Sequence, residues 1–292
     1  MADNKIIDGK LIAATIKKEI AAEVANMIDH GQDAPHLAAV IVGEDGASLT
    51  YVASKEKASQ SVGMISSVYR LKATATEKEV LDTINFLNND PEIDGYIVQL
   101  PLPDHINETK VIQSISHNKD VDGFTLYNIG LMQLGESCFL PATPFGILEL
   151  LKRSDVEISG KHVVVLGRSN IVGTPVSVML SRKGVDATVT MCHTKSKNIE
   201  DITRQADILI AAVGQPHFVQ ADMVKEGAVV IDVGIHRIKD DSEKGYHIIG
   251  DVDFDEVYKK ASKITPVPGG VGPMTIVSLL YNTLQAAKKN RK

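Results

Sequence analysis

The sequence predicts an α/β fold with two domains, of which the second is a Rossmann-like, doubly wound parallel sheet. Apolar runs of strand length alternate with segments of helical period along the chain, which is the pattern of βαβ units. One run, residues 162–166, leads through Gly167 and Gly173 into a helical segment, as in a phosphate-binding turn. The chain has 292 residues, 43% of them hydrophobic, which is enough for two cores.

The composition argues against a nucleic-acid or membrane partner. A formal net charge of −6 offers no basic surface for a polyanion, and no apolar run approaches the ~18 residues that a membrane helix needs. The N-terminal residues lack the apolar core of a signal peptide, and 2 cysteines are too few for a disulfide framework. We therefore expect a soluble protein of a reducing compartment whose partners are small molecules.

The first part of the chain alternates helices and strands. Leu11, Ile16, Ile20 and Val24 keep a helical period in the first of these segments. This order of elements predicts a parallel sheet, whose ligands bind beyond the carboxyl ends of the strands. The expected elements are a helix at residues 9–28, strands at 37–42, 65–71 and 95–99, and helices at 47–62 and 77–88.

Three groups of polar residues are expected at that edge of the sheet. Tyr51 and Lys55 are four residues apart and share one face of the helix after the first strand. Gln99 leaves the third strand just before Pro101 and Pro103, which cannot continue the sheet. The alternatives at these positions are an ordinary surface Tyr–Lys pair and a glutamine that caps backbone groups.

The third group is an acidic turn that contains Asp120, Asp122 and Gly123, in which the glycine can adopt a positive φ. Two carboxylates at this spacing could bind a metal or accept the turn's own hydrogen bonds. The turn is the preferred interpretation for Asp120, because no third or fourth oxygen ligand lies nearby in the sequence, and no metal is expected. For Asp122 a role in recognising a ligand remains an alternative to a role in the turn.

The second part of the chain follows a connecting helix, residues 126–138, and a proline-stiffened boundary, residues 139–144. Gly214 begins a turn in which a cofactor could lie close to the backbone, with plain turn geometry as an equal alternative. A loop rich in Gly and Pro, residues 264–275, leads through Pro273 into a final helix that could pack back on the first domain. The other expected elements are helices at 145–152, 177–182 and 274–288 and strands at 162–166, 186–191, 207–214 and 228–234.

The turn after the first of these strands departs from the usual dinucleotide fingerprint. Ser169 takes the second glycine position, and Gly173 falls one residue late. After the next strand an NAD site would carry Asp or Glu, but this chain has Thr194, Lys195, Ser196 and Lys197 there. Arg168 stands beside the first turn. Hydrogen-bond donors and positive charge suit a 2′-phosphate, so the sequence predicts NADP as the cofactor.

Five motifs, in this order along the chain, resemble the signature set of the bifunctional methylenetetrahydrofolate dehydrogenase/methenyltetrahydrofolate cyclohydrolase family. They lie at residues 51–55, 98–103, 119–123, 167–175 and 266–275. The resemblance covers nearly the whole chain, and five motifs together are far more specific than any one of them. Two positions depart from the common pattern: Ala142, where many members have cysteine, and Thr194, where serine often helps to hold the phosphate.

The resemblance implies two domains around a cleft, with folate bound by residues 1–140 plus 273–292 and NADP by residues 141–272. It implies NADP-dependent oxidation of 5,10-methylenetetrahydrofolate to the 5,10-methenyl form, followed by hydrolysis of that cation to 10-formyltetrahydrofolate. These reactions belong to one-carbon metabolism and supply purine biosynthesis. The resemblance further implies a cytoplasmic homodimer.

The resemblance also implies roles for individual residues. Lys55 is the expected acid/base group of the hydrolysis, Gln99 orients its amine, and Tyr51 packs on the folate rings. Asp122 accepts hydrogen bonds from the donor edge of the pterin. The other expected substrate-binding residues are Pro268, Gly269 and Gly270. The expected cofactor-binding residues are Gly167, Arg168, Ser169, Ile171, Gly173, Thr194, Gly214 and Ile235.

Two other functions are weighed against this one. A small-acid NADP dehydrogenase on a similar two-domain plan does not explain Tyr51, Gln99 and Asp122 together. A non-catalytic NADP-binding sensor would keep Arg168 but needs no lysine beside the substrate. The bifunctional folate enzyme is therefore the preferred hypothesis.

Overall fold

The structure, a computed structural model, describes residues 5–242 and 245–291. Residues 1–4, which were considered for a signal peptide, and residue 292, the last of the predicted folate domain, lie outside the described residues. The chain divides into two compact units. Residues 14–142 and 276–291 form one, which we call the three-stranded unit, and residues 5–13 and 143–275 form the other, the five-stranded unit.

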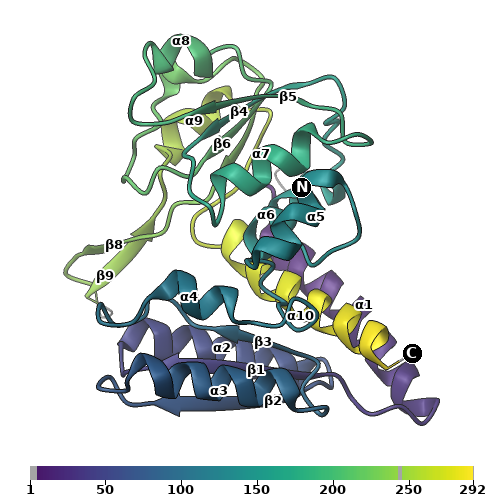
Figure 1. The fold of residues 1–292 in the computed structure, drawn as a ribbon. Helices are drawn as coiled ribbons and strands as arrows, with labels where there is room; N and C mark the ends of the chain where they lie inside the picture. Colours follow the sequence, from purple (N-terminus) through teal and green to yellow (C-terminus); the bar gives the residue numbers. More distant parts are fainter. Residues whose placement is uncertain (1–4, 243–244, 292) are drawn as a thin grey trace. The chain divides into compact units, whose positions relative to one another are not determined.

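The three-stranded unit is built on a parallel sheet with the strand order β2-β1-β3, which confirms the parallel sheet predicted from the alternation of elements (Figure 1). Helices α1 and α10 contribute most of their length to this unit and begin in the other one. The elements are α1 (Gly9–Asp29), β1 (His36–Val42), α2 (Gly46–Ser61), β2 (Ile65–Leu71), α3 (Glu77–Asn89), β3 (Gly95–Val98), α4 (Glu108–Gln113), α5 (Leu126–Leu134) and α10 (Val271–Asn290).

Local hydrogen bonds set the starts of α2 and α3. The Asp45 carboxylate accepts the backbone N–H of Ser48 at 2.8 Å. Thr76 and Glu79 form a capping box, in which each side chain accepts the backbone N–H of the other residue. A cap of this kind contributes about 1 kcal/mol to stability. Both helices therefore begin within one residue of the position that the sequence predicts.

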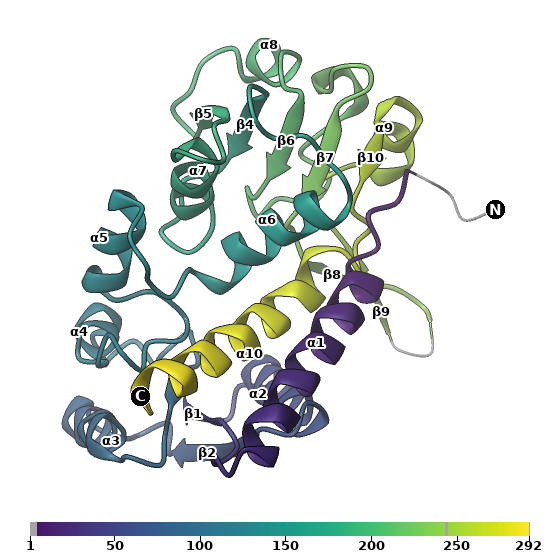
Figure 2. The same cartoon turned by 90° about the vertical axis from the view of Figure 1, so that its right-hand side faces the viewer.

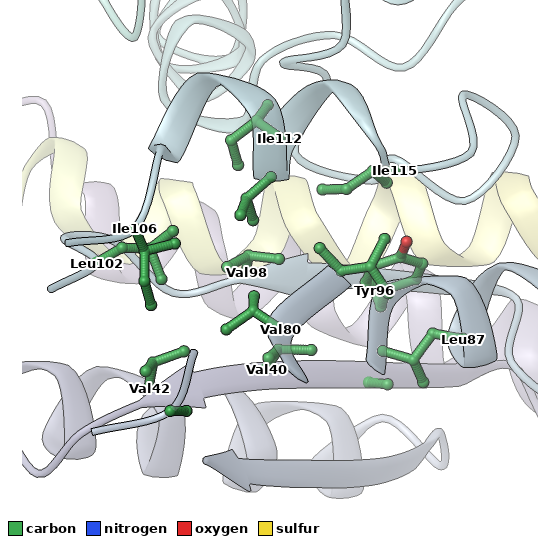
Figure 3. Packing of buried hydrophobic residues seen from close by; sticks show 14 of the residues in the cluster. Val40, Val42, Val80, Leu87, Tyr96, Val98, Leu102, Ile106, Ile112 and Ile115 are labelled. Atoms are coloured by element: carbon green, nitrogen blue, oxygen red, sulfur yellow. The ribbon is translucent and has the colours of Figure 1, made fainter. Parts of the chain in front are cut away.

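A buried apolar cluster joins this sheet to α3 and α4. Val40 of β1 and Val98 of β3 belong to the same cluster as Val80 of α3 and Ile112 of α4, and their side chains converge in Figure 3. Full burial of one such side chain contributes about 1.5–3 kcal/mol. The cluster therefore fixes the carboxyl ends of β1 and β3, from which the candidate site residues follow.

The five-stranded unit contains a second parallel sheet, with the strand order β10-β7-β6-β4-β5 (Figure 2). An antiparallel hairpin, β8–β9, follows β7 and is absent from the sequence-based prediction. The elements are α6 (Ala142–Arg153), β4 (His162–Leu166), α7 (Gly173–Ser181), β5 (Thr188–Cys192), α8 (Ile199–Thr203), β6 (Ile208–Ala211), a 3₁₀ turn (Ala221–Met223), β7 (Val229–Asp232), β8 (His236–Lys239), β9 (Tyr246–Ile249), α9 (Phe254–Lys260) and β10 (Lys263–Ile264).

Strand β4 is buried on both faces, as its continuous apolar run predicts. Successive side chains of a strand point to opposite faces of the sheet. Val163 and Val165 are as fully buried as Val164 and Leu166, none of them more than 1% exposed. The doubly covered sheet is the expected Rossmann-like arrangement.

The N-terminal segment belongs to the five-stranded unit, whereas the sequence analysis assigned residues 1–140 to one domain. The backbone N–H of Ile7 donates to Ile264 O at 2.9 Å, and the N–H of Ile264 donates to Lys5 O at 2.8 Å. The segment thus pairs with the outer edge of β10 and satisfies backbone groups that would otherwise be unpaired. A long-range pairing of this kind leaves no local signal in the sequence.

The C-terminal helix α10 packs within the three-stranded unit, as expected. The Asn282 side-chain amide donates to Val121 O at 2.8 Å and to Leu140 O at 2.9 Å.

Helix α5 is shorter than predicted, because Gly135 adopts a left-handed conformation with φ 78° and ends it. Among the residues that the structure describes, no helix is long and apolar enough to cross a bilayer.

Candidate active site and cofactor edge

Three segments deliver polar side chains to the carboxyl edge of the three-stranded sheet. Helix α2, which carries Lys55, follows β1. The backbone N–H of Gln99 donates to Val40 O at 2.8 Å, so Gln99 continues β3 beside β1. The segment before Asp122 also runs parallel to β3, and the backbone N–H of Tyr96 donates to Lys119 O at 2.9 Å. Parallel segments end at the same edge, so Gln99 and Asp122 emerge there together.

Lys55 and Gln99 are in direct contact. The Lys55 amine donates to Gln99 Oε1 at 3.1 Å, and Gln99 Nε2 donates to Leu100 O at 2.7 Å. The second hydrogen bond fixes the orientation of the amide, so that its oxygen faces the amine. Burial lowers the pKa of Lys55 from its ordinary value, and the charge of Asp122 acts in the opposite direction.

Asp122 is a half-buried carboxylate in the electrostatic field of Lys55. Burial raises its pKa to about 6, while Lys55 lowers it and Asp120 raises it further. Within residues 5–242 and 245–291, no side chain or backbone group donates a hydrogen bond to this carboxylate. Both of its oxygens are therefore available to a ligand.

Asp120 has a structural role, which confirms the preferred interpretation of the acidic turn. It is 1% exposed and accepts hydrogen bonds from the N–H of Phe124 at 3.1 Å, the N–H of Thr125 at 2.8 Å and the Asn128 amide at 2.8 Å. Gly123 has φ 72°, as expected for this turn. In the part of the chain that the structure describes, no three His, Cys, Asp or Glu residues could hold a metal ion together.

The other predicted substrate-binding residues fall into two groups. Tyr51 lies one turn before Lys55 on α2, with 46% of its surface exposed. Pro268, Gly269 and Gly270 belong to the five-stranded unit, so the structure does not place them in the same unit as Lys55. Gly269 has φ 117°, a value that an L side chain rarely adopts.

The predicted cofactor-binding residues lie in the turns after β4, β5, β6 and β7. These strands are adjacent and parallel, so their turns leave one edge of the sheet. A Cβ on Gly167 would come within 2.2 Å of Ala212 O, and one on Gly173 within 2.1 Å of Gly167 O. Gly173, although one residue late, therefore lets the start of α7 pack directly on the turn.

The exposed predicted cofactor-binding residues after β4 and β5 are mostly hydrogen-bond donors. Arg168, Ser169, Thr194 and Lys195 are exposed, as is Ile171. Ser196 is half-buried, and its hydroxyl accepts the backbone N–H of His193 at 3.0 Å, so it stabilises the turn after β5. The donor set that faces solvent therefore matches the set inferred for a 2′-phosphate, with Ser196 used locally.

Two buried aspartates at this edge are missing from the sequence-based site. Asp232, at the end of β7, accepts the backbone N–H groups of Gly234, Asp251 and Val252 at 2.9, 2.9 and 3.0 Å. Burial raises the pKa of Asp232 to about 6, against the effect of these hydrogen bonds. The only local signal is that each aspartate adjoins a glycine-containing turn at the end of an apolar run.

Asp251 is the second of these aspartates and is fully buried. One carboxylate oxygen accepts the N–H groups of Val213 and Gly214 at 2.7 and 3.0 Å. The other lies 2.7 Å from His236 Nε2. Asp251 thus connects the turn after β6 to the turn after β7.

Two family models match the chain. The model of the tetrahydrofolate dehydrogenase/cyclohydrolase catalytic domain covers residues 7–122, and the model of the NAD(P)-binding domain of the same family covers residues 141–291. A curated relative, the bifunctional protein FolD of Bacteroides fragilis, is 58% identical over 97% of this chain and 98% of its own length.

Solved structures give the same result. The bifunctional FolD dehydrogenase/cyclohydrolase of Campylobacter jejuni is 48% identical with a TM-score of 0.92, covering 97% of this chain and 98% of the other. The Trypanosoma brucei enzyme, solved with NADP and an inhibitor, is 39% identical with a TM-score of 0.93, covering 98% of both chains. The predicted α/β fold with two domains and the predicted enzyme class are confirmed. The chain therefore belongs to the tetrahydrofolate dehydrogenase/cyclohydrolase family.

Proposed function

We propose that this chain oxidises 5,10-methylenetetrahydrofolate to 5,10-methenyltetrahydrofolate with NADP and hydrolyses the product to 10-formyltetrahydrofolate. The observation that carries the proposal is the amine of Lys55, held by the Gln99 amide beside the open carboxylate of Asp122. Membership of the family supports both activities. The structural likeness to an enzyme solved with NADP supports the choice of cofactor.

The turns of the five-stranded unit fit a dinucleotide. Gly167 and Gly173 leave no room for side chains, so a phosphate can approach the backbone N–H groups at the start of α7. Arg168, Thr194 and Lys195 would bind the 2′-phosphate by charge-assisted hydrogen bonds. Ile171 and Ile235, 45% and 49% exposed, would contact the apolar faces of the cofactor. When bound, the nicotinamide supplies a hydride acceptor.

In the dehydrogenase step this chain's residues bind and orient the folate. The two oxygens of Asp122 match the adjacent N–H donors of the pterin's aminopyrimidinone edge. Tyr51 offers an exposed ring for packing on the folate, and Pro268, Gly269 and Gly270 stay further proposed substrate-binding residues. Hydride leaves the methylene carbon with its bonding electron pair and no proton moves, so position is the main requirement.

In the cyclohydrolase step Lys55 moves the protons. Water adds to the amidinium carbon of the methenyl cation, and the added water gives up one proton to the neutral amine of Lys55. A carbon–nitrogen bond of the ring then breaks while the hydroxyl oxygen forms the C=O of the formyl group. The hydroxyl proton moves through Lys55 to the departing nitrogen, and the formyl group stays on the other nitrogen. Burial favours the neutral amine, and a cationic folate nearby would favour it further. Gln99 accepts one N–H of the amine and leaves its lone pair free.

A homodimer and a cytoplasmic location complete the proposal. Both follow from the family resemblance and from an expected small-molecule substrate. Light scattering on the purified chain would measure the mass of the assembly, and a mass of one chain at micromolar concentration would contradict the dimer.

One experiment tests the proposed activities. The protein is incubated with methylenetetrahydrofolate and NADP, while NADPH and the methenyl chromophore are followed separately. We expect NADPH to form and the methenyl signal to decay faster than in buffer alone. NADPH binding without turnover would instead indicate a non-catalytic NADP-binding protein, and turnover of a small 2-hydroxy acid would indicate a different dehydrogenase.

A further inference from the structure

We propose that Asp251, with His236 as its partner, is a positioning residue of the dehydrogenase reaction that fixes the two turns carrying Gly214 and Ile235. The inference rests on the proposed function, because it takes these two turns as part of the cofactor site. It adds two residues that belong to none of the five sequence motifs. His236 is the first residue of β8, and Asp251 follows the end of β9, so the two residues lie at the base of the β8–β9 hairpin.

The carboxylate of Asp251 binds the segments that follow strands β6 and β7. Its Oδ2 accepts the backbone N–H groups of Val213 and Gly214, which follow β6, and its Oδ1 pairs with His236, which follows β7. Strands β6 and β7 are neighbours in the parallel sheet, so both turns leave the same edge. One buried side chain therefore sets the separation of two turns at the place where an open α/β sheet binds its ligand.

The backbone around Asp251 is built to hold it there. A Cβ on Gly234 would come within 2.4 Å of both the N and Oδ1 atoms of Asp251, so this close approach needs a glycine. The backbone N–H of Asp251 donates to the Asp232 carboxylate at 2.9 Å, and its carbonyl accepts the Val219 N–H at 2.9 Å. With 0% exposure, Asp251 has no water to replace a lost donor.

These contacts change the role expected of Gly214. Its N–H is donated to Asp251 at 3.0 Å and is therefore not free for a phosphate. Its Cα side is open, because among the described residues no atom lies within 4 Å of a Cβ built there, and its φ is 71°. Gly214 therefore serves the cofactor by close approach of the backbone. The positioning of that backbone falls to Asp251.

His236 completes the arrangement as a donor. Its Nε2 lies 2.7 Å from Asp251 Oδ1, and a proton on Nε2 makes the ring the donor of this hydrogen bond. The neighbouring Ile235 side chain is 49% exposed and lies 3.8 Å from the position of a Cβ on Gly272. Holding His236 thus holds Ile235 beside the first turn of α10.

The test compares two replacements of His236. His236→Gln keeps an N–H donor at about the reach of Nε2, whereas His236→Leu keeps a similar bulk without a donor. We expect His236→Leu to raise the dissociation constant of NADPH and the KM for NADP about tenfold, the worth of one hydrogen bond to a charged group. His236→Gln should restore most of both. The affinity for folate, measured by calorimetry, should not change.

Asp251→Asn is the second variant, and Asp240→Asn is its matched control. Asp240 pairs with His247 at the same 2.7 Å on the same hairpin, but the pair is exposed to solvent. We expect Asp251→Asn to weaken NADPH binding and Asp240→Asn to leave it unchanged. Equal NADPH affinity in wild type, His236→Leu and Asp251→Asn would overturn the inference, as would equal loss in His236→Leu and His236→Gln.

The binding measurement separates this inference from the proposed function. If the wild-type protein binds NADPH but does not oxidise methylenetetrahydrofolate, the proposed activity fails and the affinities of the His236 variants still decide the role of Asp251. If the wild-type protein does not bind NADPH at all, both are wrong.

Discussion

Replacing Lys55 with methionine is expected to separate the two activities. The change removes the amine that donates to Gln99 Oε1 at 3.1 Å and keeps a flexible chain of similar length. Hydride transfer moves no proton, so it depends on position and should continue. Water addition and ring opening move protons, so they should slow by the worth of a general acid–base group, ~10²–10⁴-fold. This corresponds to about 3–5 kcal/mol in the barrier.

A second effect of the same substitution acts on folate binding. The charge of Lys55 lowers the pKa of Asp122, which burial has raised to about 6. Without that charge the pKa of Asp122 rises further, so a larger fraction of this carboxyl group is neutral at pH 7. A neutral carboxyl group accepts the pterin's donors less well. The KM for folate should therefore rise at pH 7 and recover toward pH 8.5, whereas the lost cyclohydrolase rate should not recover.

The assay follows NADPH formation and methenyl decay separately between pH 6.5 and 8.5. Two controls accompany it. Lys57→Met removes an exposed lysine from the same helix and should change neither rate. Lys55→Arg keeps a positive charge beside Asp122 but cannot release a proton, so it should preserve folate binding and still lose cyclohydrolase activity. Near-normal catalysed methenyl decay in a folded Lys55→Met protein would refute the acid/base role.

Three further predictions concern other residues. The affinity of the wild-type protein for folate should fall as the pH drops through about 6, because the Asp122 carboxylate that binds folate takes up a proton there. Asp122→Ala should remove this pH dependence. Calorimetry from pH 5 to 8 measures the affinity of both proteins. Arg168→Ala should lower kcat/KM with NADP about ten- to a hundredfold and with NAD very little, whereas an equal loss with both cofactors would dismiss the 2′-phosphate contact. Gly173→Ala should lower the melting temperature, since its Cβ would meet Gly167 O at 2.1 Å, while Gly130→Ala, in open space on α5, should not; calorimetric scans of both variants decide.

The sequence predicts best the elements that are buried and bounded by turn residues. Strand β4 has the predicted limits, because its apolar run ends at Gly167, where a turn begins. Strand β2 also has the predicted limits, although its residues are exposed or half-buried. Helix α4 was not expected, since Glu108–Gln113 is too short to show a helical period. The β8–β9 hairpin was not expected either, because its strands are partly exposed and contain residues such as His236, Arg237 and His247 in place of an apolar run.

Some residues of the candidate site could be predicted from the sequence, and others could not. Lys55 and Gln99 could be expected near each other because they follow two strands of one parallel sheet, whose carboxyl ends meet at a common edge. Asp122 and the roles of all three residues came from the family resemblance. Asp232 and Asp251 could not be predicted, because their partners are backbone N–H groups from turns distant in the sequence. A carboxylate that serves backbone donors has no partner side chain to suggest a motif, so only the folded chain reveals it.

The buried and half-buried aspartates of the two units differ in whether protein groups already donate hydrogen bonds to their carboxylate oxygens. This difference predicts how substitutions in each unit affect the two proposed activities. In the five-stranded unit the carboxylates of Asp232 and Asp251 are saturated by protein donors, so they can hold turns but have little capacity left to bind substrate. In the three-stranded unit Asp120 is saturated in the same manner, whereas Asp122 is open and is coupled electrostatically to Lys55. In the proposed mechanism the three-stranded unit therefore recognises the folate and moves the protons, and the five-stranded unit holds NADP at turns of fixed backbone geometry. A hydride transfer needs both contributions, but a hydrolysis that moves only protons depends chiefly on the first. Substitutions that loosen the turns around Asp251 should therefore reduce the oxidation more than the hydrolysis, in the opposite order to substitutions at Lys55.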